Sequence, residues 1–208
     1  CTSVSDKEAL GVLRASEGQR CDDKFSVLFP GSQAPGKNFE NALSCCAIVA
    51  DFEGTEVYIR IRDRSKLSPD ILDNVENLSR KGVKIVDGDL SPGDYEDLFA
   101  MAHCVVIPYG ARSFRWRTSG ILIDALVRSR PCVAVEGTWM ARVITEFDLG
   151  VVARDESARA ISEAIRKLKK NWAHYRDRAG IGARNWLQEN SWQMLAKEVL
   201  SGIGFVDE

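Results

Sequence analysis

The stretch Arg115-Trp-Arg-Thr-Ser-Gly-Ile-Leu-Ile-Asp-Ala-Leu-Val-Arg-Ser-Arg-Pro-Cys-Val-Ala-Val135 contains a loop, a helix and a strand in succession. Its first residues are basic and polar, which predicts a loop. Apolar residues at helical spacing over 119–129 predict a helix, and the apolar run after Pro131 predicts a buried strand. A helix N-terminus carries free N–H groups and a partial positive charge, and the small residues at 118–120 would let an anion approach them. This unit therefore predicts an α/β fold and an anion site at the start of the helix.

Strand and helix signals alternate along the rest of the chain. Short apolar runs rich in β-branched residues predict strands, and apolar stripes at helical spacing lie between them. This alternation predicts an α/β, Rossmann-like fold: a doubly wound parallel sheet of about six strands with C-terminal helices. The expected strands are 25–30, 56–61, 83–86, 104–108, 132–135 and 150–153, and the expected helices between them are 39–50, 68–81, 91–102, 119–129 and 138–147.

This pattern divides the chain into three regions. Residues 1–23 are expected to form a short helix and a linker, residues 24–155 a Rossmann-like core, and residues 156–208 C-terminal helices that pack on the core. The chain begins with Cys1 and no signal-peptide pattern follows, so we expect a domain cut from a longer chain or a processed one. No apolar run approaches the roughly 20 residues that a membrane-spanning helix needs.

The overall charge argues against nucleic acid as a partner. The formal net charge is −2, so the chain lacks the basic field that attracts nucleic acid or an anionic membrane. A site for an anion must therefore be local. The basic run 166–170 is typical of a solvated helix end, and nucleic-acid contact is the alternative to that interpretation.

Cysteine and histidine positions argue against a metal site. Six cysteines occur, but none form a Cys-x2-Cys pair, and only two histidines are present. Buried free thiols in a reducing cytosol explain this usage better than disulfides, which predicts a cytoplasmic protein. His103 and His174 are interpreted as structural residues.

The residues after each strand are the candidates for a ligand site, because ligands bind parallel sheets at the carboxyl ends of the strands. Gly31 and Ser32 open the loop after the first strand, and Lys37 ends it. A lysine at the start of a helix opposes the helix dipole, and binding a phosphate would offset this cost. A flexible loop with an exposed lysine is the alternative.

Charged residues also follow the second strand. Arg60, Arg62 and Arg64 alternate there. They either surround a phosphate or form solvated ion pairs with Asp63 and Asp51. The second interpretation is favoured because exposed ion pairs are common.

Two acids mark further candidate positions. The backbone at Asp89 and Leu90, after the third strand, would hydrogen-bond the edge of a nucleobase, or form a plain turn. Asp124 lies one turn inside the helix that Thr118, Ser119 and Gly120 begin, where a carboxylate would meet a sugar hydroxyl.

Residues 109–117 form a long segment with two aromatics among three arginines. Solvent exposure alone would not favour Phe114 and Trp116. These residue types suit base stacking or pyrophosphate binding, and contact with a partner domain is the alternative. The candidate ligand residues here are Tyr109, Arg115 and Arg117, and Arg112 adds charge.

In their order and spacing these features resemble the C-terminal half of group 1, GT-B-type glycosyltransferases. The resemblance covers about residues 24–200 and is carried by Lys37-Asn38, Pro108, Ser119-Gly120, Asp124-Ala125 and the run 130–133. It implies the donor domain of a glycosyltransferase of carbohydrate biosynthesis, which binds a nucleotide-diphosphate sugar. It also implies hexosyl transfer with retention, to an acceptor (sugar, lipid or polysaccharide) held by a missing N-terminal domain. It implies no cofactor, and a peripheral membrane association of the full-length protein.

The resemblance also assigns roles to residues. Lys37 would meet the donor pyrophosphate, Asp124 would hold the ribose hydroxyls, and the backbone of Ser119 and Gly120 would meet phosphate. Lys37 and Arg117 would act catalytically by stabilising the leaving diphosphate. The complete expected binding set is Gly31, Ser32, Lys37, Asp89, Leu90, Tyr109, Arg115, Thr118, Ser119, Gly120 and Asp124, with no metal ligand.

Two departures from the family pattern support an alternative. The family's arginine is Ser32 here, and its first glutamate is Trp116. Arginines at 112, 115 and 117 would supply the missing charge. The alternative is a non-catalytic interaction or regulatory module with a degenerate glycosyltransferase fold. The fragment alone is expected to bind nucleotide weakly and to transfer nothing.

Overall fold

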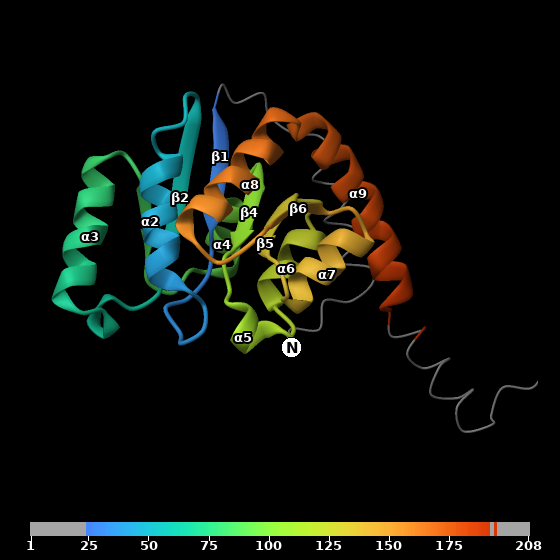
Figure 1. The fold of residues 1–208 in the computed structure, drawn as a ribbon, viewed down its shortest axis with the longest axis horizontal. Helices are drawn as coiled ribbons and strands as arrows, with labels where there is room; N and C mark the ends of the chain where they lie inside the picture. The colour runs from blue at the N-terminus through green and yellow to red at the C-terminus, as the bar shows by residue number, and fades with distance from the viewer. Residues whose placement is uncertain (1–23, 192–193, 195–208) are drawn as a thin grey trace, which may run out of the picture.

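A computed structural model describes residues 24–191 and 194, which form a six-stranded, fully parallel sheet with the order β3-β2-β1-β4-β5-β6 (Figure 1). The predicted doubly wound α/β fold and all six predicted strands are confirmed. The predicted helix and linker in 1–23 lie outside the described residues. The strands are β1 (Phe25–Phe29), β2 (Thr55–Ile61), β3 (Lys84–Asp87), β4 (Cys104–Ile107), β5 (Cys132–Val135) and β6 (Gly150–Ala153).

The helices cover both faces of the sheet. They are α2 (Phe39–Val49), α3 (Pro69–Arg80), α4 (Pro92–Met101), α5 (Ala111–Phe114), α6 (Gly120–Leu126), α7 (Trp139–Glu146), α8 (Ala158–Lys170) and α9 (Trp172–Glu189), with a 3-10 turn at Arg64–Lys66. β4 and β5 consist entirely of buried residues because helices cover them on both sides.

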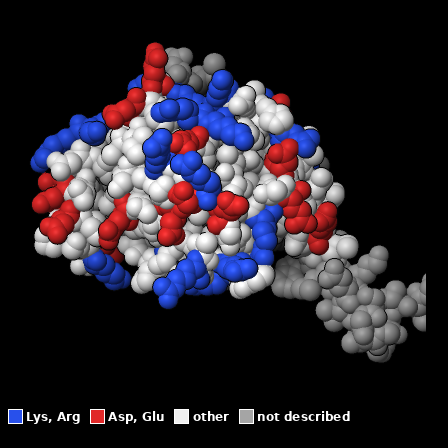
Figure 2. All heavy atoms as spheres, in the orientation of Figure 1, with Lys and Arg blue, Asp and Glu red and all other residues white. Residues whose placement is uncertain are grey.

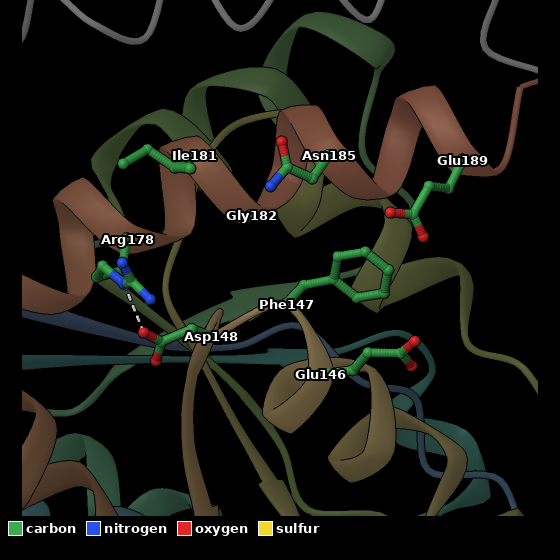
Figure 3. A pocket seen from close by; sticks show the side chains of 8 residues that line it. All are labelled: Glu146, Phe147, Asp148, Arg178, Ile181, Gly182, Asn185 and Glu189. Atoms are coloured by element: carbon green, nitrogen blue, oxygen red, sulfur yellow. Dashed lines mark hydrogen bonds and ion pairs between the residues drawn. The ribbon is translucent and has the colours of Figure 1, made fainter.

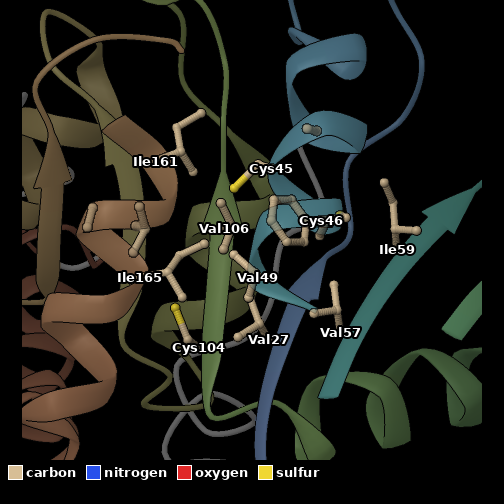
Figure 4. Close-up of a cluster of buried hydrophobic side chains, with 14 of the residues drawn as sticks. Val27, Cys45, Cys46, Val49, Val57, Ile59, Cys104, Val106, Ile161 and Ile165 are labelled. Carbon is tan, nitrogen blue, oxygen red and sulfur yellow. The ribbon is translucent and has the colours of Figure 1, made fainter. Parts of the chain in front are cut away.

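Alternating side chains of the strands enter two separate cores. Val27 and Phe29 of β1 pack with α2, α3 and α8, whereas Leu28 packs with α4, α6 and α7. Figure 4 shows part of the first core, in which Cys45 and Cys104 lie among valine and isoleucine side chains. The four cysteines of the described residues are buried free thiols, as predicted: Cys45, Cys46, Cys104 and Cys132. Cys1 and Cys21 lie outside the described part.

Side chains cap several helix starts. Ser91 and Thr138 accept hydrogen bonds from the N–H groups of Asp94 (3.2 Å) and Ala141 (3.1 Å). Ser191 Oγ likewise accepts from the N–H of Met194 (3.2 Å). The rest of the C-terminal helices expected over 156–208 lies outside the described residues. At α3, Pro69 occupies the first helical position, but Ser68 makes no side-chain capping bond.

The helices α8 and α9 pack on the sheet and on the helices beside it. α8 buries one face against α2 and β6, and α9 continues along β6 and α6. Trp172 Nε1 donates to the carbonyl O of His103 (3.2 Å), and the His103 ring lies 4.9 Å from the Trp172 ring. His103 Nδ1 accepts from the N–H of Ser26 (3.1 Å), so this histidine has the structural role that was predicted.

Two helices differ from the sequence prediction. The segment 109–117, expected to be a loop, contains one helical turn, α5. The helix expected over 119–129 ends at Leu126, because the backbone turns at Ser129 into the left-handed region with φ of 52°. Serine adopts that conformation at a cost in free energy, and no Gly or Pro within residues 127–129 signals the end of the helix.

We expect Ser129→Gly to raise the free energy of unfolding by about 1 kcal/mol, because glycine adopts positive φ without strain. The Ser129 hydroxyl is buried without a hydrogen-bond partner among the described residues, so its removal costs no bond. Urea denaturation measures the change. Ser129→Ala is the control, since it removes the hydroxyl and keeps the strain. Equal stabilities of the two variants would contradict a role for backbone strain.

Candidate functional site

The candidate site lies at the carboxyl ends of the strands, where the connections after β1 and β4 run to opposite faces of the sheet. In Figure 1 the β1–α2 loop and α5 lie below the sheet at this same edge. The N–H of Gly110 donates to the carbonyl O of Gly36 (3.0 Å), which joins the two connections. Residues predicted from separate loops therefore meet here: a small hollow is lined by Gly31, Ser32, Lys37 and Tyr109.

Lys37 is the central charged residue of this hollow. Its Nζ donates to Ser32 Oγ (3.0 Å) and lies 5.1 Å from the centroid of the Tyr109 ring. Burial, and then the charges of Arg117 and Arg62, lower the pKa of Lys37. No carboxylate of the described residues lies within ion-pair distance of Lys37. An ammonium group in this setting is stabilised when an anion binds beside it.

The backbone that carries Lys37 is held from across the chain. Asn38 has a left-handed conformation (φ 55°), and its Nδ2 donates to the carbonyl O of Glu156 (2.8 Å). Asn41 Nδ2 donates to the same oxygen (3.0 Å). The loop after β6 thereby fixes the start of α2, and with it the position of Lys37.

Tyr109 forms part of the wall of the hollow. Its side chain is buried, and its ring lies 4.5 Å from the Phe114 ring. Gly31 approaches so closely that a Cβ atom there would lie 3.4 Å from the Tyr109 ring. Burial raises the pKa of Tyr109 to about 12. The expected ligand contact of this side chain is therefore a packing contact in the structure.

The two aromatic residues of the segment around α5 lie in different environments. Phe114 is buried, and Arg117 lies over its ring with 4.8 Å between the guanidinium carbon and the centroid. Trp116 is 72% exposed. Arg112 and Arg115 are exposed as well. This segment thus presents positive charge along the sheet edge, and Figure 2 shows Lys and Arg side chains along the lower edge of the molecule.

The start of α6 follows this basic segment directly. Ser119 has an extended backbone and is buried, and its carbonyl O accepts from the N–H of Leu122 (3.1 Å). Thr118 and Gly120 are exposed on either side of it. The predicted meeting of small residues with the arginines is therefore present, although α6 has only seven residues.

The Asp124 side chain is less exposed, and has more partners, than we expected from the sequence. Tyr95 Oη donates to its Oδ2 (2.7 Å), and Arg128 Nη1 lies 3.7 Å from its Oδ1. Burial raises the pKa of Asp124, and the Tyr95 hydrogen bond and Arg128 act in the opposite direction. Arg128 also binds the Glu96 carboxylate through two guanidinium nitrogens. Asp124 thus belongs to a network between α4 and α6 and keeps 21% of its side chain exposed.

Sequence reasoning missed the partners of Asp124. Tyr95 lies 29 residues away, and no local pattern predicts that pair. Arg128 lies four residues beyond Asp124, which is the spacing of helical ion pairs, so this partner had a usable signal.

The arginines at the end of β2 form ion pairs, as the favoured interpretation expected, but with different acids. Arg62 Nε lies 2.7 Å from Asp89 Oδ1, and Arg60 Nη2 lies 3.6 Å from the same oxygen. Arg64 binds both oxygens of Asp87 (2.7 and 2.8 Å). The expected pairing with Asp51 and Asp63 was wrong, since those acids pair with Lys81 (3.7 Å) and Lys66 (3.0 Å).

A larger groove lies beside the hollow, on the side of β2 and β3. Its volume of about 810 Å³ is sufficient for a small organic ligand. Leu90 is half-buried and packs against the second core. The groove is lined by Ser32, Gln33, Ala34, Pro35, Arg62, Asp63, Lys66 and Asp89.

The described part of the chain, 24–191 and 194, contains neither a cluster of metal ligands nor a membrane-spanning helix. No three His, Cys, Asp or Glu side chains there gather closely enough to hold a metal ion. No helix there is both long and apolar enough to cross a membrane.

Known proteins resemble this chain in structure and not in sequence. No family model and no curated protein matches the sequence. Sucrose-phosphate synthase from Thermosynechococcus elongatus superposes with a TM-score of 0.66 at 18% identity, over 94% of this chain and 49% of that one. S. aureus TarM, solved with UDP and saccharides, gives 0.68 at 13%, over 88% of this chain and 36% of TarM. Starch synthase IV of Arabidopsis thaliana, bound to ADP and acarbose, gives 0.61 at 10%, over 87% and 40%.

The coverage of these structures is unequal. This chain spans about half of sucrose-phosphate synthase and less of the other two. At such identities the likeness establishes the fold.

Proposed function

We propose that this chain, which has the fold of the C-terminal domain of GT-B glycosyltransferases, binds a nucleoside diphosphate sugar and supplies the donor half of a glycosyltransferase site. Two similar structures, those of TarM and of starch synthase IV, contain UDP and ADP respectively. These bound nucleotides support a nucleotide as the ligand class. The donor would be a substrate, and the proposal requires no cofactor.

The charge around Lys37 is the observation that carries this proposal. Lys37, Arg117 and Arg62 are close enough for both arginines to lower the pKa of the lysine. Only Arg62 of the three has a carboxylate partner among the described residues, namely Asp89. A diphosphate would neutralise this group through charge-assisted hydrogen bonds. Its place between the connections after β1 and β4 is the usual ligand position of doubly wound sheets.

The remaining expected residues surround that position. The groove toward β2 and β3 would take the nucleoside, with the backbone at Asp89 and Leu90 near the base. Asp124, partly exposed beside the start of α6, would accept hydrogen bonds from the ribose hydroxyls. Thr118, Gly120 and Arg115 would lie on the phosphate side. A carboxylate thus meets hydroxyl groups, and positive or N–H groups meet phosphate.

Catalysis would consist of positioning and electrostatic stabilisation. When the sugar–phosphate bond breaks, negative charge develops on the leaving diphosphate, and Lys37 and Arg117 would stabilise it. The acceptor would be held by an N-terminal domain, which is consistent with the half-length coverage of the similar enzymes. Hexosyl transfer with retention is the course that the resemblance implies. We expect binding of nucleotide, and no transfer, by this chain alone.

We expect Lys37→Ala to weaken nucleoside diphosphate binding by roughly 10- to 100-fold, since a hydrogen bond to a charged group contributes about 1.5–3 kcal/mol. Calorimetric or NMR titration with UDP, GDP, ADP and dTDP measures the change and identifies the base. Because the pKa of Lys37 is lowered, affinity should fall at a less alkaline pH than for an ordinary lysine. This pH dependence should be flatter in Lys37→Ala.

Lys24→Ala is the matched control for this experiment. Lys24 precedes β1 at the opposite end of the strand and pairs with Glu56 (3.4 Å). Its replacement should leave nucleotide affinity unchanged. A folded chain that binds none of the four nucleotides at millimolar concentration would contradict the proposal and favour the non-catalytic interaction module.

A further inference from the structure

Four arginines at the same sheet edge have no carboxylate partner among the described residues. Arg112, Arg115 and Arg117 belong to the α5 segment, and Arg142 to α7. The segment 109–119 contains no Asp or Glu. By contrast, all three arginines at the end of β2 are paired with acids. The charge near α5 is therefore in excess of what the described residues neutralise.

The Trp116 ring lies within cation–π distance of two of these arginines. The guanidinium carbons of Arg142 and Arg115 lie 4.5 Å and 5.5 Å from its ring centroid. Arg142 Nη2 also donates to the carbonyl O of Arg115 (3.1 Å), which holds α7 against the α5 segment. The indole nevertheless remains 72% exposed. An exposed large aromatic beside two charged donors is typical of a binding surface.

The sheet order places this stack opposite the nucleoside groove. The groove lies toward β2 and β3, whereas α7 packs on β5 and β6. The Cβ of Ala111 lies 3.3 Å from the Cβ position of Gly137, so α5 adjoins the start of α7. Lys37 and Arg117 are between the two sides in strand order. A group attached beyond the diphosphate, or an acceptor that meets it, would therefore face the stack.

We propose that Arg115, Trp116 and Arg142 form a subsite for an acidic saccharide, with the indole against the sugar ring and the guanidinium groups on its carboxylate or phosphate. Arginine binds both anions through paired hydrogen bonds, and it has no acceptor for the hydroxyl protons of a neutral sugar. An anion would also relieve the repulsion between the two guanidinium groups. The assignment of the saccharide to a transferase reaction rests on the proposed function, whereas its binding does not.

The acidic group has two possible sources, the transferred sugar or the acceptor. If the donor carries it, a nucleotide-linked glucuronic acid should bind about tenfold more tightly than the corresponding nucleotide-linked glucose. If the acceptor carries it, both nucleotide sugars should bind equally. Free glucuronate or glucose 6-phosphate should then still bind when the nucleotide site is saturated.

The test is an NMR titration of the full chain with glucuronate, glucose 6-phosphate and glucose, observed at the Trp116 indole N–H. We expect the two acidic sugars to shift this signal and to bind at least tenfold more tightly than glucose. Arg115→Ala/Arg142→Ala should remove that preference. Arg166→Ala is the control, because Arg166 is also exposed, unpaired in the described chain and stacked on a ring, that of Phe52 (4.5 Å).

The outcomes separate this inference from the proposed function. Equal binding of acidic and neutral sugars, no binding of either, or an unchanged preference in the double variant would overturn the subsite. Nucleotide binding by wild type would leave the proposed function intact in each case. Acidic sugar binding by a chain that binds no nucleotide would support the subsite and contradict the donor-domain function.

Discussion

Replacing Gly150 with alanine is expected to lower the free energy of unfolding by about 4 kcal/mol or more, a loss typical of backbone clashes that cannot relax. Gly150 begins β6 and pairs with Cys132 of β5. A Cβ atom at Gly150 would lie 1.9 Å from the carbonyl O of Cys132 and 2.7 Å from its N. Its φ of 152° adds strain for any other residue. The edge strand could keep its register only by moving away from β5.

Gly82→Ala is the control that separates the cost of backbone strain from the cost of a steric clash. Gly82 also has a positive φ (89°), but no atom lies within 4 Å of its Cβ position. Its replacement should cost only about 1–2 kcal/mol, the penalty of a left-handed alanine. Urea denaturation followed by circular dichroism compares the two variants. A Gly150→Ala protein as stable as Gly82→Ala would show that β6 can shift without loss.

Gly182→Ala is expected to destabilise the chain by roughly 3 kcal/mol, because overpacking a tight contact typically costs 1–3 kcal/mol and here the contact is with backbone. A Cβ atom on Gly182 would lie 1.9 Å from the carbonyl O of Phe147 and 2.8 Å from Leu149 Cδ2. Figure 3 shows α9 passing the turn of Phe147 and Asp148, with Arg178 and Asp148 paired beside it. The added methyl group would push α9 off β6.

Gly180→Ala on the same helix is the matched control. The nearest atoms to its Cβ position lie 3.9 Å away, which is ordinary contact. Alanine is a better helix former than glycine by about 0.8–1.0 kcal/mol, so this variant should gain stability. Urea denaturation monitored by fluorescence, to which the buried Trp186 of α9 contributes, measures both. Similar effects of the two substitutions would exclude the proposed close approach.

The strands and most helices could be predicted because their signals are local. Runs such as Cys132–Val135 are apolar throughout, which is required when both faces of a strand are covered. Ser91 and Thr138 marked helix starts through a side chain that bonds the first turn. The errors arose where these signals were absent. Ser129 ended α6 without glycine or proline, and α5 is a single turn within a basic segment.

The site could be predicted in part for the same reason. Lys37 was identified from its position at a helix start, and Arg117 as one of three arginines in the segment 109–117. The structure places Arg117 close enough to lower the pKa of Lys37. The network of Asp124 with Tyr95, and the stack of Arg142 on Trp116, could not be identified. These pairs join residues 29 and 26 positions apart. No periodicity relates them.

The sequence by itself determined that this chain forms a doubly wound parallel sheet with its polar and basic loops at the carboxyl ends of the strands. Those features follow from hydrophobic period, capping residues and segment length, each of which acts within a few residues. Only the tertiary structure decided which charges meet. It paired Arg62 and Arg64 with Asp89 and Asp87, and within residues 24–191 and 194 it left Lys37 and the α5 arginines without acids. Ion pairing depends on distances between separate loops, and the packing of the helices on the sheet sets those distances.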